Sequence, residues 1–125
     1  MTFESDLYAE LSSDAGVAAL VSDRIWPSHA SDGTARPYIV YSPVFHGGIY
    51  ALEGDADLSQ VRLQVDCYAD DPDTAASVAL AVIAAIPETG RPICRSAHSN
   101  QDLGIEPGTR LFRRLLEFSI FHRSS

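Results

Sequence analysis

The stretch Asp57–Glu88, DLSQVRLQVDCYADDPDTAASVALAVIAAIPE, decides the fold because its periodicity changes halfway along. In its first half, apolar and polar residues alternate. The apolar set is Val61, Leu63, Val65 and Cys67, and the polar set is Arg62, Gln64, Asp66 and Tyr68. This alternation is the period of a β-strand with one buried face. The first half is therefore predicted to be a strand.

A helix is predicted directly after this strand. The run Asp70–Asp73 places an acid before a proline and another acid after it, which is typical of an N-cap and a first helical turn. From Ala75 to Ile86 only Ser77 is polar, and Pro87 ends the helix. Because the helix is apolar nearly all round, it needs a deep core or a partner to cover it. About twelve apolar residues are too few to cross a bilayer, which takes roughly twenty.

Length and composition limit the class of protein. A chain of 125 residues with 46% hydrophobic residues fits one domain spanning 1–125. A net charge of −8 lacks the basic footprint that neutralises phosphates, which argues against sequence-specific DNA binding. The N-terminus, MTFESDLYAEL, has neither the positive region nor the apolar run of a signal peptide, so we expect synthesis and folding in the cytoplasm.

The charge is unevenly distributed along the sequence. Residues 1–90 hold 14 acids against three arginines, a net of −11, and residues 91–125 hold three acids against six arginines, a net of +3. Such polarity suits an acidic surface of one copy meeting a basic surface of the next, in the head-to-tail contact that makes rings. An equally good interpretation is that two surface strands happen to be rich in arginine.

The remaining elements follow from spacing. Helices are expected at Phe3–Leu11 and at Ala15–Val21, and in the first of them Glu4, Asp6 and Glu10 face away from the apolar side. Strands are expected at Pro37–Ser42, Arg91–His98 and Leu111–His122, with a turn at Gln101–Gly108. The adjacent Leu115 and Leu116 indicate a β-bulge in the last strand. This order predicts a single α+β domain with a mostly antiparallel sheet and helices on one face.

The segment His46–Asp57 is longer than two adjacent strands need for a connection, so a long, mobile hairpin arm is predicted there. Such arms commonly reach a partner, and Tyr50, Glu53 and Asp55 are its candidate intersubunit contacts. The acids of Glu53–Asp57 resemble half a calcium loop but lack the third acid followed by glycine and the closing glutamate. A solvated arm is therefore the better interpretation.

Residue patterns typical of catalysis, metal binding or cofactor binding are not found. The four histidines lie in separate segments, without a cysteine or acid at metal-site spacing. Cys67 lies on the apolar side of its strand, and Cys94 has no histidine in register. We therefore expect no catalytic residue, no metal and no cofactor. A small-molecule site would require Trp26, Tyr38, Tyr41 and His46 to line one pocket.

Asp66 is the notable acid, since it lies in the middle of the central strand between Val65 and Cys67. A covered carboxylate is costly unless it is paired. One hypothesis is an ion pair or hydrogen bond with Arg113 or Arg114 of the last strand, which would fix the strand register or an intersubunit seam. The alternative is a solvent-facing acid.

Several segments together carry a family resemblance. They are Leu7–Leu11 (LYAEL), Asp14–Val21 (DAGVAALV), Arg24–Pro27 (RIWP), Pro37–Val40 (PYIV), Leu63–Ala69 (LQVDCYA) and Phe112–Arg123 (FRRLLEFSIFHR). In order and spacing, over nearly the whole chain, these segments resemble the tail-completion proteins of long-tailed phages, also called tail terminators or head-tail joining proteins. Each segment alone is ordinary amphipathic sequence, and the combination is the specific feature.

This resemblance implies a structural virion protein without catalytic residues. It implies a ring, usually hexameric, at the head-proximal end of the tail tube, where it stops tube growth and offers a docking surface to the capsid connector. The implied partners are further copies of the chain, the tube protein, the connector, and DNA that passes non-specifically through the lumen. No membrane partner is implied. An acidic lumen would let DNA slide. Similar proteins occur in gene transfer agents and prophage remnants, and a tube or connector subunit of related fold is the alternative.

Overall fold

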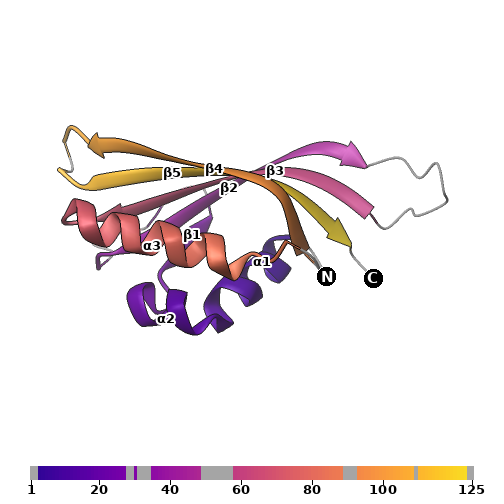
Figure 1. Cartoon of the computed structure of the whole chain (residues 1–125), viewed down its shortest axis with the longest axis horizontal. Coiled ribbons are helices and arrows are strands. Elements are labelled where there is room, and N and C mark those ends of the chain that lie inside the picture. The colour runs from indigo at the N-terminus through magenta and orange to yellow at the C-terminus, as the bar shows by residue number, and fades with distance from the viewer. Residues whose placement is uncertain are drawn as a thin grey trace.

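The computed structural model describes residues 3–27, 30, 35–48, 58–88, 93–108 and 110–123. The elements are α1 (Phe3–Ser13), α2 (Ala15–Val21), β1 (Ile25–Pro27), β2 (Tyr38–Gly48), β3 (Leu58–Ala69), α3 (Pro72–Ala85), β4 (Ile93–Ile105) and β5 (Phe112–Arg123). The five strands form one sheet in the order β1-β2-β3-β5-β4, antiparallel except for the β1-β2 pair. The helices lie on one side of this sheet (Figure 1). The predicted α+β class is confirmed.

The sheet has a covered face and an open face, set by the alternation in its central strand. Val61, Leu63, Val65 and Cys67 of β3 are all fully buried on the covered face. Their neighbours in register on β5 continue this face with Leu116, Phe118 and Ile120, which are also buried. On the open face, β3 presents Gln60, Arg62, Gln64, Asp66 and Tyr68. The core therefore lies between the covered face and the three helices.

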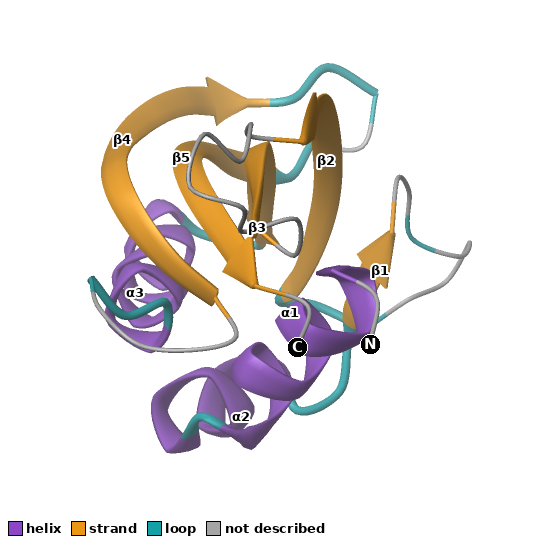
Figure 2. Cartoon of the chain, turned by 90° about the vertical axis from the view of Figure 1, so that its right-hand side faces the viewer, coloured by secondary structure: helices purple, strands orange, loops and turns teal. Residues whose placement is uncertain are grey.

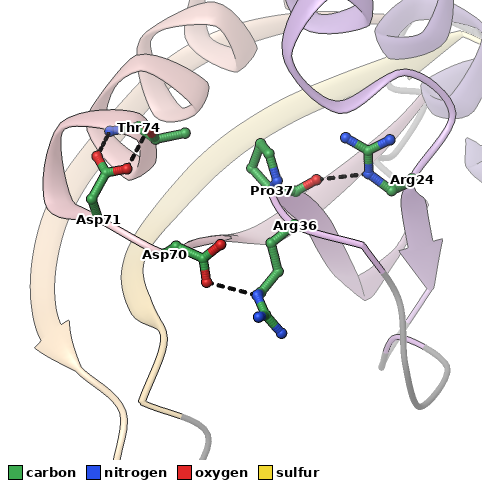
Figure 3. Close-up of polar contacts among 6 residues, drawn as sticks. All are labelled: Arg24, Arg36, Pro37, Asp70, Asp71 and Thr74. Atoms are coloured by element: carbon green, nitrogen blue, oxygen red, sulfur yellow. Dashed lines mark hydrogen bonds and ion pairs between the residues drawn. The ribbon is translucent and has the colours of Figure 1, made fainter.

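The start of α3 agrees with the sequence pattern. The Asp71 carboxylate accepts a hydrogen bond from the Thr74 amide at 2.7 Å and one from the Thr74 hydroxyl at 2.9 Å (Figure 3). These hydrogen bonds hold the pKa of Asp71 below its usual value. Pro72 is the first helical residue, where its missing amide costs nothing. The predicted N-cap of this helix is confirmed.

The apolar circumference of α3 is covered on two sides. Ala75, Val78, Ala79 and Val82 are buried, and the helix contacts the sheet as well as α1 and α2. Leu80 projects away from the core and is 63% exposed. A core therefore covers most of this helix, and one stripe of it remains open.

Two polar contacts hold the beginning of β2 in place (Figure 3). Arg24 Nε donates to the Pro37 carbonyl at 3.0 Å, and Arg36 Nε lies 2.7 Å from Asp70 Oδ1. Through these contacts the segment ahead of β1 and the end of β3 are joined to the same short stretch of chain. The Arg36–Asp70 pair is exposed and contributes on the order of 0–1 kcal/mol.

The prediction that Asp6 faces away from the core is wrong. Asp6 is 6% exposed, and its carboxylate lies 2.7 Å from Nε2 of His122, which is 5% exposed. Phe3 packs edge-on against the His122 ring. Asp6 lies next to Leu7 on the buried side of α1, so its carboxylate reaches the end of β5 and is paired there. This contact joins the first helix to the last strand.

The first three residues of the predicted arm, His46 to Gly48, belong to β2. β2 continues to Gly48, and its pairing with β3 extends to Gly48 opposite Ser59, with a register shift after Phe45. His46 to Gly48 are therefore strand residues, because backbone pairing with β3 extends as far as Gly48. Tyr50, Glu53 and Asp55 lie outside the described residues. Beyond Tyr41, β2 pairs with no described strand on its β1 side, so Pro43 lies at an edge, where proline is tolerated in a sheet.

The bulge predicted at Leu115 and Leu116 is wrong. β5 pairs with β3 without a register shift from Phe112 to Arg123. Leu116 points to the core, while Leu115 stands opposite Asp66 on the open face, where it is half-buried. The open face thus accommodates a leucine without breaking the alternation.

The irregularities occur in β4 instead, between Arg95 and Ala97 and between Asp102 and Ile105. Gly104 adopts a φ of 71°, a backbone conformation that glycine allows at little cost, and pairing resumes at Ile105. The strand predicted to end at His98 therefore continues to Ile105, and part of the predicted turn is strand.

Candidate assembly surface

A cluster of charged and aromatic side chains occupies the open face at the end of β3. Arg113 Nε donates to Asp66 Oδ1 at 2.8 Å, and a second Arg113 nitrogen lies 3.9 Å from Glu106 Oε2. The Arg113 guanidinium lies 5.9 Å from the Tyr68 ring centroid. Tyr38 stacks on Tyr68 with 5.1 Å between ring centroids. We call these five residues the Asp66 cluster.

Burial and pairing make the Asp66 cluster a strong local contact. Asp66 is 8% exposed, so its carboxylate is not the solvent-facing acid of the alternative hypothesis. The hydrogen bond from Arg113 to Asp66 raises the pKa of that arginine. Burial raises the pKa of Tyr68 to about 12, against the lowering effect of Arg113. The cluster ties β3, β5 and the β4–β5 turn together on the face that none of the described helices covers.

Arg114 belongs to the other face of β5 and does not contact Asp66. Its guanidinium lies 3.7 Å from the Asp102 carboxylate and donates to the Asn100 side chain at 3.1 Å. Alternation along β5 explains this division, because Arg113 and Arg114 point to opposite sides of the sheet. Of the two arginines that the sequence nominates, Arg113 is the partner of Asp66. An intersubunit role for either arginine stays a prediction.

The arginines of residues 91–125 offer less free positive charge than the sequence indicates. Arg113 pairs with Asp66, Arg114 with Asp102, and Arg95 lies 4.0 Å from Glu88. The Arg95 Nε also donates to the Ile86 carbonyl at 2.7 Å, which caps the end of α3. Three of the six arginines are thus engaged within the chain, which weakens an electrostatic argument for head-to-tail contact.

Residues that could serve chemistry are not brought together in the described part of the chain. No three His, Cys, Asp or Glu side chains there could hold a metal ion, and none of the described helices is long and apolar enough to span a membrane. Burial raises the pKa of the Cys67 thiol far above its ordinary value, so the reactive thiolate is disfavoured.

Asp6 and His122 form a buried pair that the sequence did not predict. Its only sequence signal is that Asp6 follows the apolar Phe3 by three residues, which places both on one side of α1.

The pocket required by a small-molecule site does not form from the two tyrosines nominated for it. Tyr38 lies on the open face, where it stacks on Tyr68, whereas Tyr41 is buried on the covered face. A depression of about 210 Å³ on the sheet is lined by Arg62, Ala97, His98, Ser99, Glu117, Phe118 and Ser119. It is shallow and polar, and it is smaller than the roughly 300–1,000 Å³ of typical ligand pockets.

The chain is similar to a protein of a known virion particle and matches one protein family over nearly its whole length. A chain of a solved structure titled "Virion of native gene transfer agent (GTA) particle" is similar with a TM-score of 0.67 and 16% identity, over 97% of this chain and 92% of that one. At this identity the likeness shows a shared fold, that of a chain found in a virion particle. The family described as tail completion protein gp17 matches residues 5–123. No curated protein matches. The chain therefore belongs to the tail completion protein family and is a structural protein of a phage-type tail.

Proposed function

We propose that this protein forms a ring at the head-proximal end of a tail tube, where it terminates tube growth and joins the tail to the capsid connector. The observation that carries this proposal is the family match over residues 5–123, which leaves little of the chain for another function. The partners are further copies of the chain in a hexameric ring, the tube protein, the connector protein, and DNA in the lumen. No catalytic role is proposed.

The shape of the domain is compatible with ring formation. Its two sheet edges differ: β1 has three residues, Ile25–Pro27, whereas β4 has thirteen, Ile93–Ile105. Unlike sides favour head-to-tail contacts, and contacts of this kind close into rings when the rotation between copies allows it. Because the domain is small, the contact between any two copies can be weak in isolation. Stable assembly then depends on several such contacts forming together.

The charges of the open face bear on passage of DNA. Asp66 and Arg113 neutralise each other, and Arg62 is balanced by Glu117 in the adjacent row of β5. The exposed acids Glu4, Asp23 and Asp73 belong to the helices or to the segment that follows α2. If the open face lines the lumen, DNA meets a nearly neutral polar surface in place of an acidic one, which also disfavours tight binding.

The test is tube assembly in the presence and absence of this protein. Purified tube protein from the same particle is polymerised alone and with the protein, and tube lengths are measured by negative-stain electron microscopy. The proposal predicts a ring on one end of each tube and arrest of growth at that end. Tubes that continue to grow at both ends, with the protein unbound or spread along their length, would contradict it.

A further inference from the structure

The two edges of the sheet differ in how well they are protected, and this difference suggests where copies meet. In the order β1-β2-β3-β5-β4, β4 stands at one end of the sheet, on the side opposite β1 (Figure 2). Every described residue of β4 from Ser96 to Leu103 is exposed. Its outer row of backbone donors and acceptors has no strand partner among the described residues.

Natural proteins usually protect such an edge with charges, proline, short length or β-bulges. β4 has none of these protections over the stretch Ala97–Gln101, which reads AHSNQ, contains no charged residue and no proline, and pairs regularly with β5. Register irregularities flank the regular pairing at Arg95/Ala97 and at Asp102/Ile105. They delimit an uncharged stretch of strand that pairs regularly with β5 and whose outer edge can receive one more strand.

The opposite side of the sheet carries a second free stretch. β1 pairs with β2 only from Ile39 to Tyr41, so β2 from Ser42 to Gly48 pairs with no described strand on that side. Its regular part is Ser42–Phe45, because the register with β3 shifts after Phe45, and the regular part of β4 is Ala97–Asp102. The two free stretches lie at opposite ends of one sheet, which is the arrangement that lets identical copies join head to tail.

Strand direction makes the two stretches compatible. β2, β3, β5 and β4 alternate in direction along the sheet, so β4 runs opposite to β2. Rotation about an axis roughly parallel to the strands preserves their direction, so β4 of one copy meets β2 of the next in antiparallel orientation. Antiparallel pairing is the slightly more stable form of strand pairing.

We propose that the Ala97–Gln101 edge of β4 pairs with the free β2 edge Ser42–Gly48 in a neighbouring copy, giving a sheet that is continuous around the ring. The partner is a second copy of this chain. This inference rests on the proposed ring and specifies the contact within it.

Sheet register predicts which side chains meet across this contact. Ser42 stands opposite Gln64, Gln64 opposite Glu117, and Glu117 opposite Ser99, so Ser42 and Ser99 lie in one row on the open face. In a ring without strand stagger, Ser99 of one copy faces Ser42 of the next, which sets Asn100–Asp102 beside the β2 residues that already pair with β1. A stagger that places Gln101 opposite Ser42 keeps β4 beside the free β2 edge. Stagger moves the contact by two residues at a time, to Ala97 or Gln101, because a shift of one would turn the side chain to the other face.

Disulfide trapping tests the contact. In a Cys94→Ser background, Ser42→Cys is combined in turn with Ala97→Cys, Ser99→Cys or Gln101→Cys, and the assembled protein is oxidised and run on a non-reducing gel. Directly opposed residues of antiparallel strands are close enough for a disulfide. One of the three pairs should give a ladder of covalent multimers up to the copy number of the ring, which reductant abolishes.

The matched control is Ser42→Cys with Asn100→Cys, because Asn100 pairs with Leu116 and lies on the other face of the sheet. Its crosslinked fraction should fall at least about tenfold, since thiols on opposite faces cannot reach disulfide geometry. Circular dichroism confirms that each variant is folded.

The outcomes separate this inference from the proposed function. Rings seen by electron microscopy without crosslinking of any of the three pairs would overturn edge pairing alone. Equal crosslinking of the Asn100 control, or dimers from Ser99→Cys by itself, would also overturn it, because the second result indicates symmetric pairing of two β4 strands. Absence of rings even in the presence of tail tubes contradicts the proposed function.

Discussion

Replacing Arg113 with methionine should destabilise the fold by an amount that can be estimated from the burial of its partner. The substitution keeps most of the apolar stem and removes the charge that faces Asp66. Asp66 is 8% exposed and would remain as a covered carboxylate without its closest donor. Loss of one partner costs about 3–5 kcal/mol for a fully buried pair and about 0–1 kcal/mol for an exposed one.

The Arg113 side chain is 31% exposed, so the pair lies between these limits. We expect a loss of about 2 kcal/mol in the free energy of unfolding. For a domain of this size, that corresponds to a fall in Tm of roughly 6–10 °C. Urea denaturation followed by circular dichroism measures the free energy, and thermal denaturation measures the Tm.

Arg114→Met is the matched control, because Arg114 is the next residue of the same strand and its partner Asp102 is 56% exposed at 3.7 Å. Its loss should stay within about 0.5 kcal/mol. Adding Asp66→Asn to Arg113→Met should recover part of the stability, since no unpaired charge then remains. Equal losses for Arg113→Met and Arg114→Met, or a loss below about 0.5 kcal/mol for Arg113→Met, would refute the reasoning. If the pair also lies at an intersubunit seam, Asp66→Asn changes oligomer size as well.

Three further predictions concern other polar groups. Asp6→Asn should cost about 1–3 kcal/mol in urea denaturation by weakening a buried contact, whereas exposed Glu4→Gln should have little effect. Asp71→Ala should lower the Tm near neutral pH. The pKa of Asp71 in the folded protein lies below its usual 3.8, so the difference in Tm between this variant and the unsubstituted protein is full above pH 3.8 and disappears as the pH falls through the folded pKa. Spectrophotometric titration should detect one tyrosine with a pKa of about 12 that Tyr68→Phe removes, and the stabilisation from that raised pKa should be lost as pH rises from about 10 to about 12.

Local pattern was sufficient to predict the elements around the central strand. The alternation from Val61 to Cys67 gave the face of β3, and the acid before Pro72 gave the start of α3. Both depend on contacts within a few residues, or on one buried face, and periodicity reports these directly. The same logic located the open face, since the polar half of the alternation had to point away from the helices.

The errors arose where contacts distant in sequence decide the outcome. Asp6 was assigned to the solvent because acids usually are, but His122, which pairs with it, lies at the other end of the chain. The strand was predicted to end at Ser42 because Pro43 cannot donate a hydrogen bond to a neighbouring strand, although pairing of β2 with β3 extends to Gly48. Choosing between Arg113 and Arg114 as the partner of Asp66 required the strand register, which a single sequence does not fix.

The most direct test of the central claim is a cryo-electron microscopy reconstruction of tails assembled with this protein. The account predicts that density fitting the α+β domain forms one closed ring at the head-proximal end of the tube, with β4 of each copy beside β2 of the next. Density for this chain along the shaft of the tube or at its distal tip, with the head-proximal end occupied by a different protein, would contradict it.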